Sequence, residues 1–130
     1  MLAAVVIAAV VVGACSGGPS PSGSTSAVAS GSAPPVTVTI VARGIVFVPA
    51  RLELPADVPF TLVFDNQDAG IPHGLSLSTR TSGVPPKKVF DAAIFPGPDG
   101  RTYDIPGIKA GPYLFSCPVH PVMTVELDIR

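Results

Sequence analysis

Apolar and polar residues alternate along most of the chain from Val36 to Arg130. Short runs with this period of two are separated by proline, glycine, asparagine and aspartate, a pattern typical of β-strands joined by turns. No segment has the period of an amphipathic helix, so the pattern predicts an all-β domain. The expected strands cover residues 36–42, 45–48, 51–54, 59–65, 73–78, 88–90, 101–105, 112–117 and 123–129.

The alternation also predicts which side chains face the core, because successive residues of a strand point to opposite faces. Val125, Leu127 and Ile129 share one face of the last strand, and Tyr113, Phe115 and Cys117 share one face of the strand before it. Strands at this spacing suit a two-sheet β-sandwich, and about 95 residues bury an adequate core without disulfides. A closed barrel is the alternative.

The first fifteen residues, MLAAVVIAAVVVGAC, follow a different pattern, because they are apolar apart from one glycine. This run is shorter than the roughly 20 residues of a membrane-spanning helix and matches the apolar core of an export signal, although no lysine or arginine precedes it. Its end, VGAC, resembles a bacterial lipobox, which makes Cys15 the expected site of lipidation. A plain cleaved signal and an uncleaved hydrophobic stub are the alternatives.

Residues 16–35 contain glycine, serine and proline but no charged or aromatic residue. Such a segment cannot bury enough apolar surface to fold, so we expect a flexible tether. The predicted organisation is therefore an export signal (1–15), a linker (16–35) and one folded domain (36–130). This places the domain outside the cytoplasm, either lipid-anchored to the bacterial membrane or free in the periplasm or medium.

The composition and charge of the chain exclude some classes of function. The formal net charge of the chain is −1, and every charged residue lies from Arg43 onward. Neither a basic stripe for nucleic acid nor an acidic tail is present. We expect a monomer that binds no nucleic acid.

Four side chains carry the candidate chemistry. After residue 15 the chain contains one cysteine, two histidines and one methionine, and three of these four lie within CPVHPVM (117–123). Cys117 ends a predicted strand, His120 lies in a turn and Met123 begins the next strand. One short loop therefore presents a thiolate, an imidazole and a thioether, and His73, at the start of another strand, is the candidate fourth ligand.

This ligand set favours copper. Two histidines, one thiolate and a weak methionine sulfur form the trigonal-plus-axial arrangement of copper electron-transfer sites. Structural zinc sites use four Cys or His ligands, and catalytic zinc sites use three strong ligands and a water. Taken singly, Cys117 could be a buried free thiol and His73 a hydrogen-bonding residue at a strand start.

Two neighbouring carboxylates, Asp65 and Asp68, flank Asn66 and Gln67 in the segment before His73. We interpret them as turn residues rather than as an acid–base pair. With both histidines assigned to the metal, none remains for a Ser-His or Cys-His nucleophile pair.

The segment FSCPVHPVM resembles the ligand loop of the cupredoxins, the type 1 blue copper proteins of the amicyanin and plastocyanin-like kind. Its two-residue gaps on both sides of His120 are most similar to amicyanin, whereas plastocyanin has a longer gap before its methionine. GIPHGLSL is similar to the segment of the first histidine. The resemblance implies a Greek-key sandwich that holds one copper ion, Cu(II) or Cu(I), through His73, Cys117, His120 and Met123. It also implies a redox partner that docks near His120, on an apolar surface formed by Ile71, Pro72, Pro118, Val119, Pro121 and Val122.

Two residues, Gly74 and Val125, depart from the family pattern, and Pro121 adds a further constraint. Family members often carry a glycine where Val125 stands, two residues after the methionine, and this change should alter strand packing more than coordination. The residue after the first histidine is commonly an asparagine that ties the two ligand segments together, whereas this chain has Gly74. Pro121 has no N–H to donate to the thiolate, and fewer such hydrogen bonds should favour Cu(II).

The leading functional hypothesis is a one-electron carrier rather than an enzyme, and the alternative is a copper-binding lipoprotein for storage or delivery. Multicopper oxidases and nitrite reductases share the implied fold, but they need a second copper site with further histidines. The binuclear copper domain of cytochrome oxidase needs two cysteines, and only Cys117 is available. A copper-free accessory domain would have no need for all four ligand types.

Overall fold

The computed structural model describes residues 35–130. The predicted export signal, the lipidation site Cys15 and all but the last residue of the predicted linker lie outside this range. Within it, no helix has the length and hydrophobicity needed to cross a membrane.

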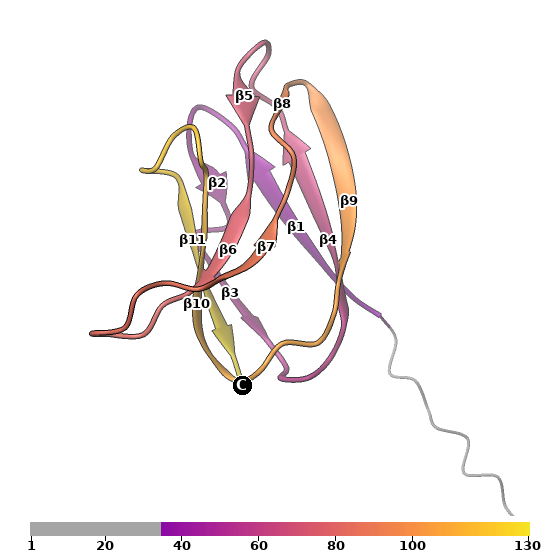
Figure 1. The fold of residues 1–130 in the computed structure, drawn as a ribbon. Helices are drawn as coiled ribbons and strands as arrows, with labels where there is room; N and C mark the ends of the chain where they lie inside the picture. Colours follow the sequence, from indigo (N-terminus) through magenta and orange to yellow (C-terminus); the bar gives the residue numbers. More distant parts are fainter. Residues whose placement is uncertain (1–34) are drawn as a thin grey trace, which may run out of the picture. The chain divides into compact units, whose positions relative to one another are not determined.

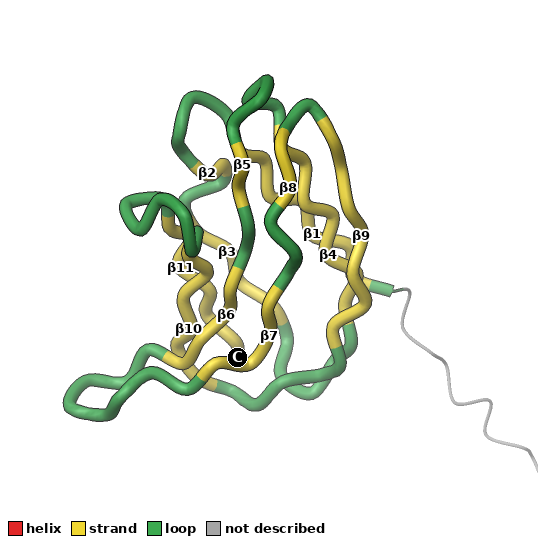
Figure 2. The backbone as a smooth tube through the Cα atoms, turned by 45° about the horizontal axis from the view of Figure 1, so that its top comes forward, coloured by secondary structure: helices red, strands yellow, loops and turns green. Residues whose placement is uncertain are grey.

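Residues 35–130 contain strands and no helix, as the alternating pattern predicts (Figures 1 and 2). The strands are β1 (Val36–Ala42), β2 (Phe47–Val48), β3 (Arg51–Leu54), β4 (Phe60–Asn66), β5 (Pro72–His73), β6 (Ser76–Thr79), β7 (Lys88–Asp91), β8 (Phe95–Pro96), β9 (Asp99–Ile105), β10 (Gly111–Ser116) and β11 (Thr124–Ile129).

Two mixed sheets form the layers of a sandwich, which confirms the predicted fold class (Figure 1). One sheet has the order β2-β1-β4-β9, in which β1 and β4 are parallel. The other has the order β3-β11-β10-β6-β7, in which β3 and β11 are parallel. β5 and β8 form a separate short pair at one end of the sandwich.

The core lies between the two sheets and follows the predicted faces. Phe115 and Val125 are cross-strand partners in β10 and β11, and both are fully buried. On the facing sheet, Phe64 lies edge-on to Phe47 and Phe95, with ring centroids 5.9 and 5.4 Å apart. Aromatic pairs in this arrangement add stability beyond the area that they bury.

Three predicted strands differ in the structure by more than one residue, and one of them, expected at 101–105, begins two residues earlier at Asp99 in β9. Residues 73–78 form two strands rather than one, because the chain leaves the ladder at Gly74 and Leu75 between β5 and β6. The predicted strand 45–48 begins only at Phe47, because Ile45 belongs to a turn. β8 has only two residues and no alternation to reveal it.

The turn between β1 and β2 is tight and strained. Gly44 and Ile45 both have positive φ, 64° and 58°, and the Arg43 N–H donates to the Val46 carbonyl at 3.0 Å. Two central residues with positive φ make a type I′ hairpin turn, which matches the twist of the flanking strands. Glycine adopts this conformation freely, whereas a β-branched residue such as Ile45 does so only at a cost.

Ile45→Gly should therefore stabilise the protein. Left-handed φ costs a non-glycine residue roughly 1–2 kcal/mol, and the extra freedom of glycine in the unfolded chain offsets part of this gain. Denaturant titration should show a rise of up to about 1 kcal/mol in the free energy of unfolding. A loss of stability would mean that the Ile45 side chain, which is 43% exposed, contributes more by packing than its backbone costs.

Candidate metal centre

His73 lies in β5 and is completely buried. Buried Asn66 holds the segment before it, because its side-chain amide donates to the carbonyls of Ile71 and Phe95, each at 2.9 Å. The Asn66 side-chain oxygen in turn accepts the Asp68 N–H at 3.1 Å. β8 pairs with β5 so that Phe95 lies opposite His73. The hydrogen bonds of Asn66 and the pairing of β5 with β8 therefore position His73.

The loop between β10 and β11 positions the other three candidates. Cys117 follows β10 and Met123 precedes β11, and the Cys117 N–H donates to the Met123 carbonyl at 3.1 Å. The Met123 N–H donates to the His120 carbonyl at 2.9 Å, which closes the turn at the tip of the loop. Pro118 and Pro121 fix φ on either side of His120 and restrict its backbone.

Three donor atoms from these two segments converge. Nδ1 of His73 lies 3.2 Å from Nδ1 of His120, and the Cys117 Sγ lies 3.8 Å and 4.0 Å from these two nitrogens. His73 and Cys117 are buried, whereas His120 is partly exposed. Two ring nitrogens this close cannot both present lone pairs to each other, so the arrangement requires a proton or a cation between them.

The three separations would suit one metal ion bound by all three donors. Bonds of about 2.0–2.1 Å to histidine nitrogen and about 2.3 Å to thiolate could reach such an ion from each donor atom. A Cys-His-His set beside a methionine would suit copper, because copper electron-transfer sites use these donors.

Met123 is 1% exposed and belongs to the same core cluster as Cys117. Its backbone bonds to Cys117 and His120 keep it beside both residues. Its role as the weak fourth ligand remains a prediction from the sequence pattern.

Asp68 contacts the candidate centre, which the residue pattern did not predict. Its Oδ2 lies 2.8 Å from Nε2 of His73, while its carboxylate also accepts the N–H groups of Gly44 at 2.6 Å and Ile45 at 3.0 Å. The N–H groups of Ile45 and Gly44, aided by His73, hold the pKa of Asp68 below its ordinary value, although desolvation acts in the opposite direction. The interpretation of Asp68 as a turn residue alone was therefore incomplete.

The carboxylate determines which nitrogen of His73 is free. An ionised carboxylate only accepts hydrogen bonds, so the Nε2 that faces it must carry the ring proton. Nδ1 then presents its lone pair to the candidate centre, as a neutral imidazole ligand requires.

The space beside Gly74 explains its departure from the family pattern. A Cβ at this position would lie 2.8 Å from Cγ1 of Ile94 and 3.3 Å from Cδ of Pro118. These two side chains occupy the place where a larger residue would stand, so the two ligand segments meet here through apolar contact.

The thiol sulfur accepts a hydrogen bond from the backbone N–H of His120 at 3.4 Å. Pro121, the next residue, has no N–H to add a second bond. Within residues 35–130, the His120 N–H is the backbone donor found at this sulfur.

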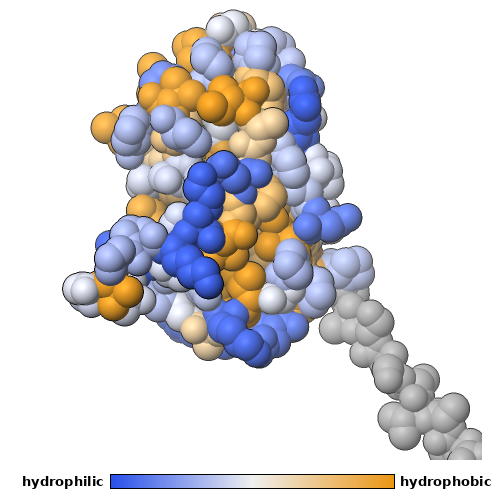
Figure 3. Space-filling model, in the orientation of Figure 1, coloured by the Kyte–Doolittle hydropathy of each residue, from blue (hydrophilic) through white to orange (hydrophobic). Residues whose placement is uncertain are grey.

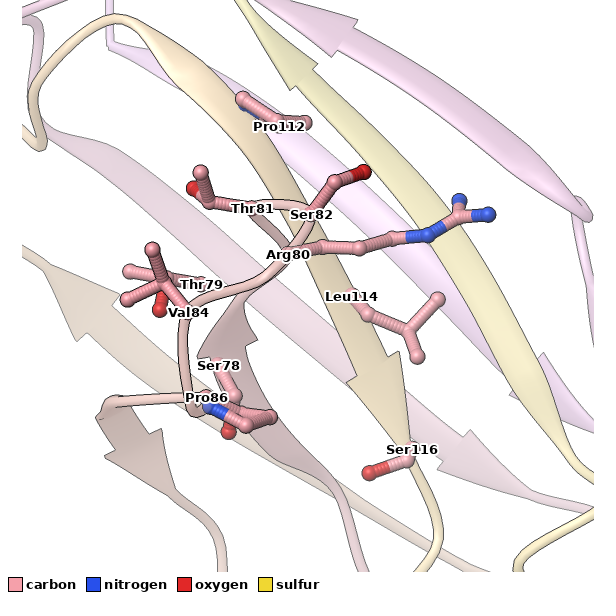
Figure 4. A pocket seen from close by; sticks show the side chains of 10 residues that line it. All are labelled: Ser78, Thr79, Arg80, Thr81, Ser82, Val84, Pro86, Pro112, Leu114 and Ser116. Atoms are coloured by element: carbon pink, nitrogen blue, oxygen red, sulfur yellow. The ribbon is translucent and has the colours of Figure 1, made fainter.

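A pocket of about 530 Å³ lies elsewhere, between the outer face of β10 and the segment that links β6 to β7 (Figure 4). Pro112, Leu114 and Ser116 point into it, while the alternate residues Tyr113, Phe115 and Cys117 point into the core. The pocket is therefore separated from the candidate metal centre by the thickness of a sheet, and none of the four candidate ligands lines it.

No protein-family model and no curated protein matches the chain. Solved structures do match its fold. Auracyanin A, a blue copper protein from Chloroflexus aurantiacus, has a TM-score of 0.64 and 21% identity, over 74% of this chain and 99% of its own. A reduced Cu(I) form of an amicyanin mutant has a TM-score of 0.53 and 16% identity, over 72% of this chain and 82% of its own.

A copper-containing nitrite reductase from Thermus scotoductus also matches, with a TM-score of 0.53 and 26% identity. The match covers 74% of this chain but only 22% of the reductase. The likeness is therefore to one structural unit of a larger enzyme. From Val36 to Ile129, the two packed sheets have the cupredoxin fold shared with auracyanin and amicyanin.

Proposed function

We propose that the protein is a mononuclear type 1 copper protein that carries one electron at a time outside the cytoplasmic membrane. The observation that carries the proposal is the convergence of Nδ1 of His73, Nδ1 of His120 and Sγ of Cys117, which lie 3.2 to 4.0 Å from one another. Met123 is the proposed weak axial ligand. Bound copper supplies a centre that alternates between Cu(II) and Cu(I).

The protein contributes rigidity to this exchange. His73 is fixed by Asp68 and the β5–β8 pair, and Cys117 and His120 are fixed by a loop with two prolines and two closing hydrogen bonds. A site that keeps one geometry in both oxidation states needs little reorganisation when an electron arrives or leaves. Preorganised ligands of this kind are what an electron carrier requires.

The surface around His120 supports docking of a redox partner there. His120 is partly exposed, whereas His73 and Cys117 are buried, so His120 is the ligand nearest to solvent. Val119 and Val122 beside it are 39% and 84% exposed. Figure 3 shows hydrophobic surface at the end of the sandwich that carries β5 and the β10–β11 loop. Exposed apolar patches of this kind mark interaction sites.

Storage or delivery of copper is the competing function, because it would use the same ligands. Enzymatic turnover is less well supported. The chain has two histidines in total, and both belong to this one centre, whereas a second copper site would need more. We further propose that Cys15 carries the lipid anchor that holds the domain at the membrane.

Spectroscopy and voltammetry of the full chain loaded with one Cu(II) test the carrier function. We expect an intense visible charge-transfer band, a reversible one-electron wave and retention of copper in the presence of a metal-free acceptor protein. Ready transfer of copper to the acceptor without a reversible wave would support delivery instead. A colourless Cu(II) protein would contradict type 1 coordination.

A further inference from the structure

Asp68 connects the strained β1–β2 turn to the candidate metal centre. Its side chain is 9% exposed, and its two oxygens accept three hydrogen bonds from groups far apart in the sequence. Oδ1 accepts the Gly44 N–H, and Oδ2 accepts both the Ile45 N–H and the Nε2–H of His73. This shared oxygen makes the position of the His73 ring depend on the turn.

The carboxylate has little freedom to move away. Two backbone N–H groups hold it from the side of the turn, where positive φ at consecutive residues aims both groups at one point. Its own backbone is bonded on both sides, because the Asp68 N–H donates to Asn66 and its carbonyl accepts the Ile71 N–H at 3.1 Å. Strained backbone is often kept where a functional geometry depends on it.

A carboxylate bonded to the outer nitrogen of a ligand histidine has two effects. It orients the ring and raises the basicity of the nitrogen that faces the metal. Its negative charge also favours the more highly charged oxidation state, and burial weakens the screening of that charge by solvent and salt.

We propose that Asp68 is a positioning residue that holds His73 with Nδ1 toward the metal and lowers the reduction potential of the copper by favouring Cu(II). This inference rests on the proposed copper-binding function. A side chain outside the four ligands, held by the β1–β2 turn, therefore influences the reduction potential of the centre through its charge.

Asp68→Asn tests the proposal, because the amide keeps the shape but removes the charge and one acceptor oxygen. Loss of such an outer partner typically costs about 10- to 100-fold in metal affinity. We expect this loss for Cu(II) and a smaller one for Cu(I). Each tenfold loss of Cu(II) affinity relative to Cu(I) affinity raises the one-electron potential by about 59 mV. Voltammetry of the full chain measures the shift, and chelator competition measures both affinities.

Asp65→Asn is the matched control. It removes a carboxylate three residues earlier that bonds the Gln67 side chain at 2.7 Å. The control should leave the potential and both affinities close to those of the wild type. Equal potentials in the Asp68→Asn and Asp65→Asn variants would overturn the proposal, whereas a wild type without a visible band or a reversible wave would refute the copper function itself.

A second readout does not depend on the folding of any variant. In the metal-free wild type, long-range ¹H–¹⁵N spectra should show the His73 proton on Nε2, exchanging slowly because it is buried and bonded to Asp68. A proton on Nδ1 with an unprotonated Nε2 would be incompatible with the hydrogen bond from His73 to Asp68 and would overturn the proposal.

Discussion

Cys117→Ser should abolish the intense visible band of the Cu(II)-loaded protein and weaken copper binding by more than roughly 100-fold. Loss of an outer partner of a ligand already costs about 10- to 100-fold, and here the thiolate ligand itself is removed. A serine hydroxyl is a harder donor than a thiolate, and it cannot provide the same charge transfer to Cu(II). Visible absorption and chelator competition on the full chain measure both effects.

Ser116→Ala is the control for this substitution. Ser116 is the neighbouring residue, but its side chain lies on the opposite face of β10, toward the pocket in Figure 4. The Ser116→Ala variant should therefore keep both the band and the affinity. If the band persisted in the Cys117→Ser variant, Cys117 would not be a copper ligand. The protein would then bind copper at a different kind of site.

Phe64→Ala should cause a large loss of stability, about 3–5 kcal/mol in the free energy of unfolding. Phe64 has no exposed surface and contacts the rings of Phe47 and Phe95, so its truncation leaves a cavity that both neighbours line. Single domains have a total stability of only about 5–15 kcal/mol, so the variant should unfold at a far lower denaturant concentration. Chemical denaturation of the metal-free chain gives the difference directly.

The Phe64→Ala variant also tests the coupling of metal binding to folding. A ligand that binds only the folded state adds about 4 kcal/mol when its concentration is 1,000 times the dissociation constant, so copper should restore much of the loss. Val84→Ala, at a side chain that is 57% exposed, should change stability by less than about 0.5 kcal/mol. A similarly small effect of Phe64→Ala would show that the core relaxes to fill the cavity.

The alternation of apolar residues was sufficient to predict the sheets, because side-chain direction in a strand depends only on its period of two. Val125, Leu127 and Ile129 are buried as expected, and so are Tyr113, Phe115 and Cys117. The pattern failed where the backbone departs from regular strand geometry, at Ile45 in the turn and at Gly74 between β5 and β6. β8 was missed because two residues carry no period and form a strand only through their pairing with β5.

The spacing along the chain was sufficient to place a thiolate, an imidazole and a methionine sulfur on one short loop, because seven residues between two strands leave no other arrangement. It also indicated His73 as the second imidazole. The proximity of the donor atoms of His73, Cys117 and His120, within 4.0 Å of one another, follows from the folded arrangement, because long-range strand pairing brings His73 to the loop. The Asp68 carboxylate contacts both His73 and the N–H of Ile45, 23 residues earlier in the chain, and a pattern of alternating residues does not indicate such side-chain contacts.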